Sequence, residues 1–193
     1  MNKLLSELRN LRKFDVDTYF DKKINQINNF FTENGLDAVV LGISGGIDSA
    51  TTLALLMKAA DKETSPIKKI TALSMPIFCK GTTDQKSAIE LSLNDIEKYR
   101  NNKKFKFRCD DLSLAHSAYT QQRNGETTPF SSGQLASIVR TPHLYFNAAI
   151  LQTEGYKSLV CGTTNRDEGF YQILCRNAPS FRSGMQRIGN QIF

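Results

Sequence analysis

A short glycine turn between an apolar segment and a helical one constrains this chain more than any other feature. Residues 38–41 (Ala-Val-Val-Leu) are all apolar and predict a buried strand. The large apolar side chains of residues 50–60 fall at helical spacing, which predicts a helix. Residues 44–49, with the sequence Ser-Gly-Gly-Ile-Asp-Ser, join the two. The pattern therefore predicts a strand, a tight turn and the start of a helix.

A turn of this composition is suited to binding an anion. Glycines can adopt positive φ and leave no Cβ in the way of a ligand, so the amides can point outward beside the positive end of the helix. Ser44 and Ser49 add hydroxyl donors. Asp48 would repel a phosphate unless a cation lay between them, which indicates Mg²⁺, an ion that takes few protein ligands. The alternative is an ordinary turn in which Asp48 only complements the helix dipole.

The turn resembles the SGGxDS pyrophosphate loop of the ATP pyrophosphatase (PP-loop) enzymes. It has neither the Gly-Lys-Ser/Thr ending of a Walker loop nor the Gly-x-Gly-x-x-Gly spacing of a dinucleotide fingerprint. The resemblance implies that ATP is cleaved to AMP and pyrophosphate through an adenylated intermediate. The implied ATP-binding residues, with the backbone of Met75 at the adenine, are Gly42, Ser44, Gly45, Gly46, Asp48, Ser49 and Met75.

Length and composition are those of an ordinary globular protein. A chain of 193 residues can bury a substantial core, and we expect a single domain over residues 1–193. No apolar run approaches the length of a membrane span, so we expect a cytoplasmic protein. The net charge of +6 suits nucleic acid or a small polyanionic substrate, but no basic block is interleaved with aromatic residues, which argues against nucleic acid. The four cysteines include no CxxC pair, which argues against zinc and against disulfides.

The rest of the chain alternates predicted helices and strands. Helices are expected over residues 14–31, 83–99 and 134–154, strands over residues 70–75, 105–109 and 156–161, and Asp110-Asp111 as the cap of a further helix. Pro142 should kink or interrupt the last helix, and the polar residues 120–132 are expected to form either a lid or a plain surface loop. The alternation predicts a three-layer α/β/α fold with a mainly parallel sheet. Ligands bind such sheets beyond the carboxyl ends of the strands, which puts residues 44–49, 75–76 and 162–169 along one edge.

A second motif follows the last predicted strand, residues 162–169, with the sequence Gly-Thr-Thr-Asn-Arg-Asp-Glu-Gly. A helix N-cap is one interpretation of it. Together with the glycine turn, however, it resembles the GTxNxxE element of the ammonia-dependent NAD synthetases. The resemblance implies that Thr163 contacts the nucleotide and that Glu168 completes the Mg²⁺ site with Asp48. Gln134 and Arg140 fall in that family's Asn-x-x-x-Arg-x-Arg helix pattern, where Ile138 replaces the first arginine, and they are expected to meet the dinucleotide.

The resemblance covers residues 15–171 and implies a ligase of the adenine nucleotide α-hydrolase-like (PP-loop ATPase) fold, with Asp48, Thr163 and Glu168 as catalytic residues. In the implied reaction ATP adenylates nicotinic acid adenine dinucleotide, and ammonia then attacks the activated carbonyl. NAD⁺, AMP and pyrophosphate are the products, and Mg²⁺ assists. The ammonia would come from solution or from a partner. The resemblance also implies a homodimer with the dinucleotide near its interface.

Beyond Glu168 the chain departs from that family. Ser180 falls where the family has an Asp, and the family's later Lys and Thr have no match before Phe193. We expect either a truncated chain or a divergent member in which Arg176 or Arg182 substitutes. Two other functions stay open. One is a different PP-loop adenylating enzyme, GMP synthetase-like or tRNA-modifying, and the other is a nucleotide-binding relic with impaired catalysis.

Overall fold

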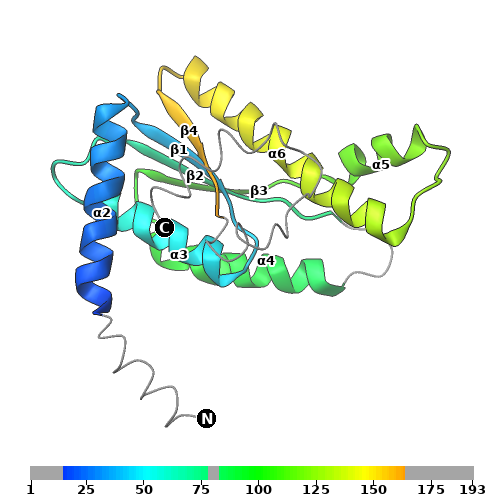
Figure 1. Ribbon diagram of the computed structural model, residues 1–193, viewed down its shortest axis with the longest axis horizontal. Helices are drawn as coiled ribbons and strands as arrows, with labels where there is room; N and C mark the ends of the chain where they lie inside the picture. The colour runs from blue at the N-terminus through cyan, green and yellow to red at the C-terminus, as the bar shows by residue number, and fades with distance from the viewer. Residues whose placement is uncertain (1–14, 78–82, 164–193) are drawn as a thin grey trace, which may run out of the picture.

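A parallel β-sheet lies between two layers of helices in the computed structural model of the chain, which describes residues 15–77 and 83–163 (Figure 1). The predicted three-layer α/β fold is confirmed. In chain order the elements are α2 (Val16–Glu33), β1 (Ala38–Gly42), α3 (Ile47–Ala60), β2 (Lys69–Ser74), α4 (Thr83–Ile96), the 3₁₀ turn η1 (Glu97–Tyr99), β3 (Phe105–Cys109), α5 (Ser113–Gln121), α6 (Pro129–Thr153) and β4 (Ser158–Cys161).

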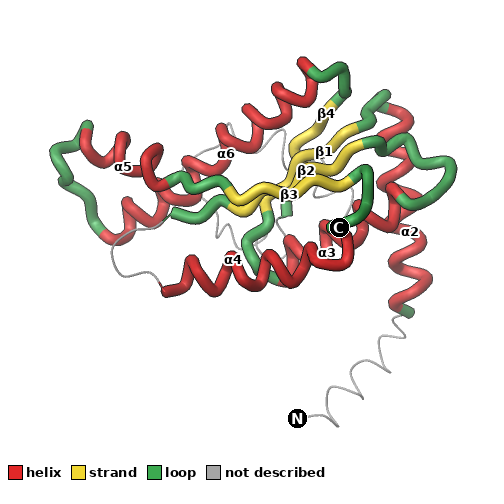
Figure 2. Tube along the Cα trace, turned by 180° about the vertical axis from the view of Figure 1, so that it is seen from behind, coloured by secondary structure: helices red, strands yellow, loops and turns green. Residues whose placement is uncertain are grey.

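The four strands of the described part run parallel in the order β3-β2-β1-β4. The chain passes outward from β1 to β2 and β3, and then returns to place β4 on the other side of β1. The direction of winding therefore switches between β1 and β4. Figure 2 shows α5 and α6 on one face of this sheet and α3 and α4 on the other, and α2 packs against α3.

β1 is buried on both faces, which explains why its sequence is apolar throughout. Val39 and Leu41 belong to the core that α2 and α3 complete. Ala38 and Val40 belong to the core on the side of α6. All four side chains have no exposed surface. A parallel strand covered by helices on both sides has to be apolar on both faces. The continuous apolar run at residues 38–41 therefore predicted this buried strand correctly.

The strands expected from the sequence are found with ends shifted by at most two residues, but the start of α6 was predicted wrongly. This helix begins at Pro129 rather than at Gln134, so the expected long loop is only a short turn after α5. The Thr128 hydroxyl accepts from the Ser131 N–H at 3.1 Å, and the Ser131 hydroxyl accepts from the Thr128 N–H at 2.9 Å. This reciprocal cap lets Pro129 take the first helical position, where its missing N–H has no partner to lose.

α6 is assigned as one continuous helix through Pro142, so the expected interruption does not occur. None of the helices within residues 15–77 and 83–163 has the length and hydrophobicity that crossing a bilayer requires.

Asp37 joins three segments at the amino edge of the sheet. Its Oδ1 accepts from the Lys157 N–H at 2.7 Å, just before β4, and its Oδ2 accepts from the Lys68 ammonium at 3.0 Å, just before β2. Its carbonyl oxygen also accepts from the Lys68 N–H at 2.7 Å. Burial alone raises the pKa of the Asp37 carboxyl, but the bonds from Lys68 and Lys157 outweigh burial and bring this pKa below its ordinary value of 3.8.

We expect Asp37→Ala to lower the free energy of unfolding by about 1–3 kcal/mol at neutral pH, because it leaves the Lys157 N–H without its acceptor. The folded-state pKa lies below the unfolded-state value. The carboxylate's contribution is therefore present above about pH 4 and is lost as the pH falls through the folded-state value. Urea denaturation at neutral pH and near pH 3 measures the difference between wild type and variant, which should shrink in acid.

Asp61→Ala provides the control for this experiment. The Asp61 carboxylate accepts a single exposed bond from the Asn102 amide, at 3.2 Å. Its removal should change the free energy of unfolding by less than about 0.5 kcal/mol at either pH. A wild-type to Asp37→Ala difference that stayed the same in acid would show that the carboxylate is not the source of the stability.

Candidate functional site

The carboxyl ends of β1, β2 and β4 bring three of the predicted site segments to one edge of the sheet (Figure 1). Leu41 of β1 pairs with Ala72 of β2 on one side and with Cys161 of β4 on the other. The glycine turn begins two residues after the end of β1. Met75 directly follows β2, and Thr163 lies two residues after the end of β4. Because the winding switches between β1 and β4, this edge is where a sheet of this order binds ligands.

The glycine turn has the backbone geometry that an anion site needs. Gly45 has a φ of +78°, in the left-handed region that residues with a Cβ rarely adopt. Gly46 is the N-cap of α3 and offers no side-chain hydrogen bond to the first turn. The first-turn N–H groups therefore have no acceptor from their own cap, and the positive end of the helix dipole faces the turn. The amides and the dipole would both attract an anion placed there.

Ser44 and Ser49 are bonded to each other and to the turn. The Ser49 hydroxyl donates to the Gly46 carbonyl at 2.9 Å and accepts from the Ser44 N–H at 3.3 Å. The Gly46 N–H lies 3.3 Å from the Ser44 hydroxyl oxygen, to which it donates. Ser49 is buried, so its hydroxyl shapes the turn from the inside, whereas Ser44 is exposed. Direct contact of either hydroxyl with ATP stays a prediction.

Gly42 and Met75 pack beneath the turn. A Cβ at Gly42 would lie 3.1 Å from the Met75 side chain and 3.9 Å from the Leu144 side chain. The Met75 side chain is buried in the core on the side of α6. Its carbonyl oxygen accepts from Arg140 Nε at 2.9 Å. This bond ties the end of β2 to α6, and the part that Gly42 or Met75 plays toward ATP stays a prediction.

Gln134 and Arg140 both lie on α6 and are half-buried. The bond from Arg140 to the end of β2 holds its guanidinium group at the ligand edge. Burial lowers the pKa of the Arg140 guanidinium below its ordinary value. An arginine nevertheless stays protonated at neutral pH, so the edge carries a fixed positive charge.

Asp48 is the one predicted metal ligand that the structure places. It lies in the first turn of α3, whereas Glu168 lies outside the described residues. Within residues 15–77 and 83–163 no three His, Cys, Asp or Glu side chains gather as a metal cluster. A single carboxylate beside an anion-binding turn suits Mg²⁺, which takes one or two carboxylates together with phosphate and water. It does not suit zinc, which takes three or four protein ligands.

A polar cluster lies at the end of β3, where the sequence predicted only a helix cap. The Asp110 carboxylate accepts from Arg108 Nη2 at 3.0 Å and lies 2.8 Å from His143 Nε2. Arg108 also donates to the Asn147 side chain at 3.0 Å. Of the two residues predicted as a helix cap, only Asp111 bonds to the start of α5, with an N–H at 2.8 Å. A signal was available, because charged side chains that follow a strand end lie at the ligand edge of this fold.

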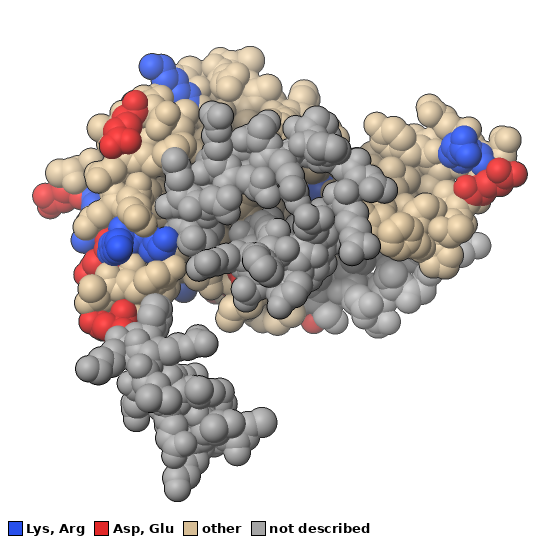
Figure 3. Space-filling view, viewed as in Figure 1, with Lys and Arg blue, Asp and Glu red and all other residues tan. Residues whose placement is uncertain are grey.

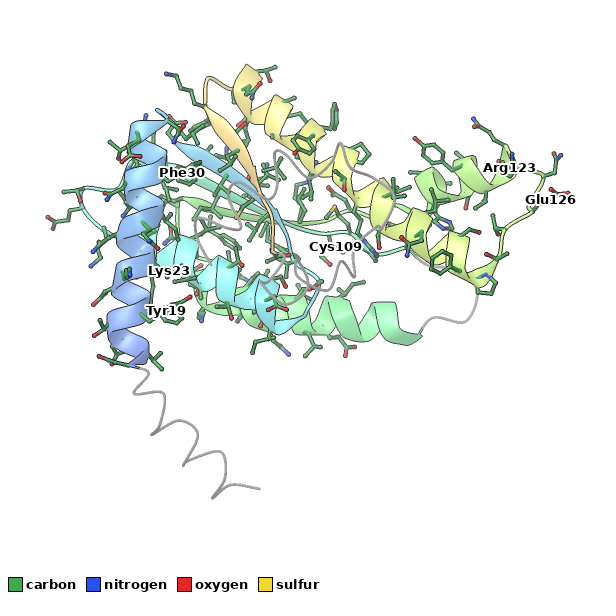
Figure 4. The ribbon with its side chains drawn as sticks, viewed as in Figure 1. Tyr19, Lys23, Phe30, Cys109, Arg123 and Glu126 are labelled. Carbon is green, nitrogen blue, oxygen red and sulfur yellow. The ribbon has the colours of Figure 1, made fainter. Side chains whose placement is uncertain are left out.

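The two cysteines within the described residues, Cys109 and Cys161, are free thiols. Cys109 ends β3, where Figure 4 labels it, and is exposed, whereas Cys161 ends β4 and is buried. Burial raises the pKa of the Cys161 thiol to about 12 and is also the main cause of a raised pKa at Cys109. Neither thiol therefore has the depressed pKa that marks a nucleophilic cysteine.

A hollow of about 720 Å³ lies away from the glycine turn, between α5 and the start of α6. Side chains of both helices and of their connecting turn line it, among them Tyr119, Arg123 and Glu126. Figure 4 labels Arg123 and Glu126 at the tip of this helical pair, well apart from α3. None of the predicted site residues that the structure describes lines this hollow.

The chain is similar in sequence to NAD synthetases. A model of the NAD synthase family matches residues 19–172. The NH(3)-dependent NAD(+) synthetase of Staphylothermus marinus is 33% identical over 145 residues, which cover 75% of this chain and 47% of that protein. The NH(3)-dependent NAD(+) synthetase of Pyrococcus furiosus is 30% identical over 149 residues, which cover 77% of this chain and 50% of that protein. The chain thus spans about half the length of these relatives.

Solved structures show the same fold. The NH3-dependent NAD synthetase of Campylobacter jejuni in complex with the nitrate ion has a TM-score of 0.61 and 26% sequence identity, covering 80% of this chain and 59% of that one. The NMN synthetase of Francisella tularensis has a TM-score of 0.64 and 24% identity, covering 83% of this chain and 59% of that one.

We expect Gly46→Val to abolish the binding of ATP with Mg²⁺. A Cβ at this position would lie 3.3 Å from the Ser44 hydroxyl, and a branched side chain would extend into the space where we expect the phosphates. The fold should survive, because the φ of −87° at Gly46 is open to valine. Isothermal titration calorimetry measures the affinity, and far-ultraviolet circular dichroism measures the fold. Gly133→Val is the matched control, since a Cβ there meets nothing within 4 Å. Wild-type affinity in Gly46→Val would refute the assignment of the turn.

Proposed function

The chain belongs to the NAD synthase family, and we propose that it converts nicotinic acid adenine dinucleotide to NAD⁺, driven by cleavage of ATP to AMP and pyrophosphate, with ammonia as the nitrogen source. The observation that carries this proposal is the glycine turn at the start of α3, at the same sheet edge as Met75 and Thr163. A helix start that attracts anions, beside two further strand ends, suits the triphosphate and the adenosine of one nucleotide.

The proposed reaction consists of two transfers. The carboxylate of the dinucleotide attacks the α-phosphorus of ATP, the bond to the β-phosphate oxygen breaks, and pyrophosphate leaves. Ammonia then attacks the carbonyl carbon of the adenylate, AMP leaves, and the ammonia nitrogen releases a proton to water. The chain aligns the reactants and stabilises developing charge. The turn amides with Ser44 hold the pyrophosphate, Thr163 orients the adenylated group, and Arg140 with Gln134 meets the dinucleotide.

The proposal assigns Mg²⁺ to Asp48, with Glu168 as the second carboxylate. Asp48 fits this role because its carboxylate lies in the same helical turn as the amides that attract phosphate. Two negative groups side by side need a cation between them. When bound, the ion would offset the charge that grows on the leaving pyrophosphate.

A homodimer is a further part of the proposal. The large apolar side chains exposed on α5 and α6 include Leu114 (86%), Tyr119 (56%), Phe130 (76%), Tyr145 (47%) and Phe146 (62%). The two helices pack on each other, and the His116 ring of α5 lies 3.2 Å from the Ser132 carbonyl oxygen of α6. Large apolar side chains exposed on adjoining helices are typical of a protein interface.

The remaining features fit a small-molecule enzyme of a reducing compartment. Among the described residues visible in Figure 3, Lys and Arg lie next to Asp and Glu, which does not favour a nucleic acid partner. The free thiols of Cys109 and Cys161 are typical of the cytoplasm.

Formation of NAD⁺ from the dinucleotide, ATP, Mg²⁺ and an ammonium salt tests the proposed function. We expect NAD⁺, AMP and pyrophosphate in equal amounts. Nicotinic acid mononucleotide is the second acceptor to assay, because it carries one phosphate fewer than the dinucleotide. Ile138 is 50% exposed and offers no cation for a phosphate at the position where the family's helix pattern has an arginine. ATP binding without turnover of either acceptor would refute the enzyme and favour a nucleotide-binding relic. Turnover with a purine nucleotide or a tRNA instead would favour another PP-loop enzyme.

Removal of either proposed Mg²⁺ ligand should slow pyrophosphate release. Asp48→Asn and Glu168→Gln should each raise the barrier by ~2–4 kcal/mol, the scale of one lost electrostatic contact. The double variant should lose little more than either single one, because one ion serves both carboxylates. The measurement is the rate of pyrophosphate release at saturating Mg²⁺ in the four proteins of this cycle. Fully additive losses would mean that the two carboxylates act separately.

A further inference from the structure

α6 presents a polar strip to the carboxyl ends of β2 and β3. Arg140, His143 and Asn147 are spaced by three and then four residues, so they lie on one face of the helix. Arg140 Nε donates to the Met75 carbonyl oxygen at 2.9 Å, directly after β2. His143 Nε2 lies 2.8 Å from Asp110 Oδ2, directly after β3. A carboxylate only accepts, so Nε2 is the donor in this bond.

Asp110 is the point at which β2, β3 and α6 meet. Its Oδ1 accepts from Arg108 Nη2 of β3 at 3.0 Å, and its Oδ2 accepts from His143 of α6. Its own N–H donates at 2.8 Å to the carbonyl of Ser74, the residue before Met75. The Asp110 and His143 side chains are 16% and 23% exposed, so water competes with this pair less than with a surface pair.

Pro142 weakens α6 between Arg140 and His143, the two residues that bond to the strand ends. It has no N–H to donate to the Ile138 carbonyl, and its ring crowds that group. The weakened turn separates the first part of α6, which carries Gln134 and Arg140, from the later part, which carries His143 and Asn147. The bond of His143 to Asp110 lies on one side of the proline and the bond of Arg140 to Met75 on the other. The two bonds therefore attach α6 to the strand ends on both sides of Pro142.

We propose that Asp110 and His143 are positioning residues that hold Arg140 in place to bind the acceptor substrate. This inference rests on the proposed function, in which Arg140 contacts nicotinic acid adenine dinucleotide. The pair supports α6 and the ends of β2 and β3, whereas the glycine turn that binds the ATP phosphates is built on β1 and α3. Loss of the pair therefore weakens binding of the acceptor more than binding of ATP, which the pair reaches only through Met75 at the end of β2.

The test variant is His143→Leu, which removes the donor and leaves Asp110 Oδ2 without this partner. Isothermal titration of the full chain should show about tenfold weaker binding of nicotinic acid adenine dinucleotide, the usual scale for one lost partner of a shielded carboxylate. The affinity for ATP with Mg²⁺ should fall much less, because its phosphates bind on the turn between β1 and α3. His143→Gln should restore most of the acceptor affinity, because its amide can supply an N–H near the position of Nε2.

Glu154→Gln is the matched control. Glu154 follows the other end of α6 and ties it to the sheet through an ion pair with Lys69, at 3.1 Å and away from the ligand edge. If any loosening of α6 weakened acceptor binding, this variant would do so as well. The inference predicts wild-type affinity for both ligands.

Hydrogen–deuterium exchange measures the same effect without a ligand. The amides of residues 134–141 should exchange faster in His143→Leu and at the wild-type rate in His143→Gln and Glu154→Gln. Equal losses of acceptor and ATP binding in His143→Leu, failure of His143→Gln to restore affinity, or unchanged exchange would overturn the positioning role. If the unaltered chain bound no acceptor, the proposed function would be wrong, and the exchange rates alone would decide whether the pair holds the helix.

Discussion

Every part of the candidate site depends on the parallel pairing of β1 with both β2 and β4. Parallel strands end at the same edge of a sheet, so this pairing brings the glycine turn, Met75 and Thr163 to one side of the molecule. The pairing in turn depends on a strand that can be buried on both faces. Residues 38–41 supply it, because all four of their own side chains are apolar and can be covered by helices from both sides.

The ligand edge owes much of its electrostatics to the backbone. The first-turn amides of α3 provide the positive potential, and the left-handed Gly45 turns the chain so that the helix can begin there. Preorganised dipoles of this kind need little reorganisation when charge develops on a ligand. Asp48 and Arg140 add side chains of opposite charge. At the opposite edge, the bonds of Asp37 join the segments that precede β1, β2 and β4.

The sequence predicts the features whose signals are local. The strands and the glycine turn fall where hydrophobic runs and glycines predict them, and the prediction of a parallel sheet follows from the alternation of elements. The start of α6 was missed because Pro129 suggests a loop until the cap from Thr128 is seen. The pairing of Asp110 with His143 was missed for a different reason. The two residues are 33 positions apart, and only the packing of α6 over the strand ends brings them together.

The central claim is that the nucleotide binds at the carboxyl edge, on the turn between β1 and α3. Amide chemical shifts of isotopically labelled chain, followed by nuclear magnetic resonance during titration with ATP and Mg²⁺, test it most directly. The account predicts the largest shift changes at residues 44–49 and at Met75, with little change at Asp37, Lys68 and Lys157 on the opposite edge. Changes centred on that opposite edge, or on the hollow between α5 and α6, would contradict it.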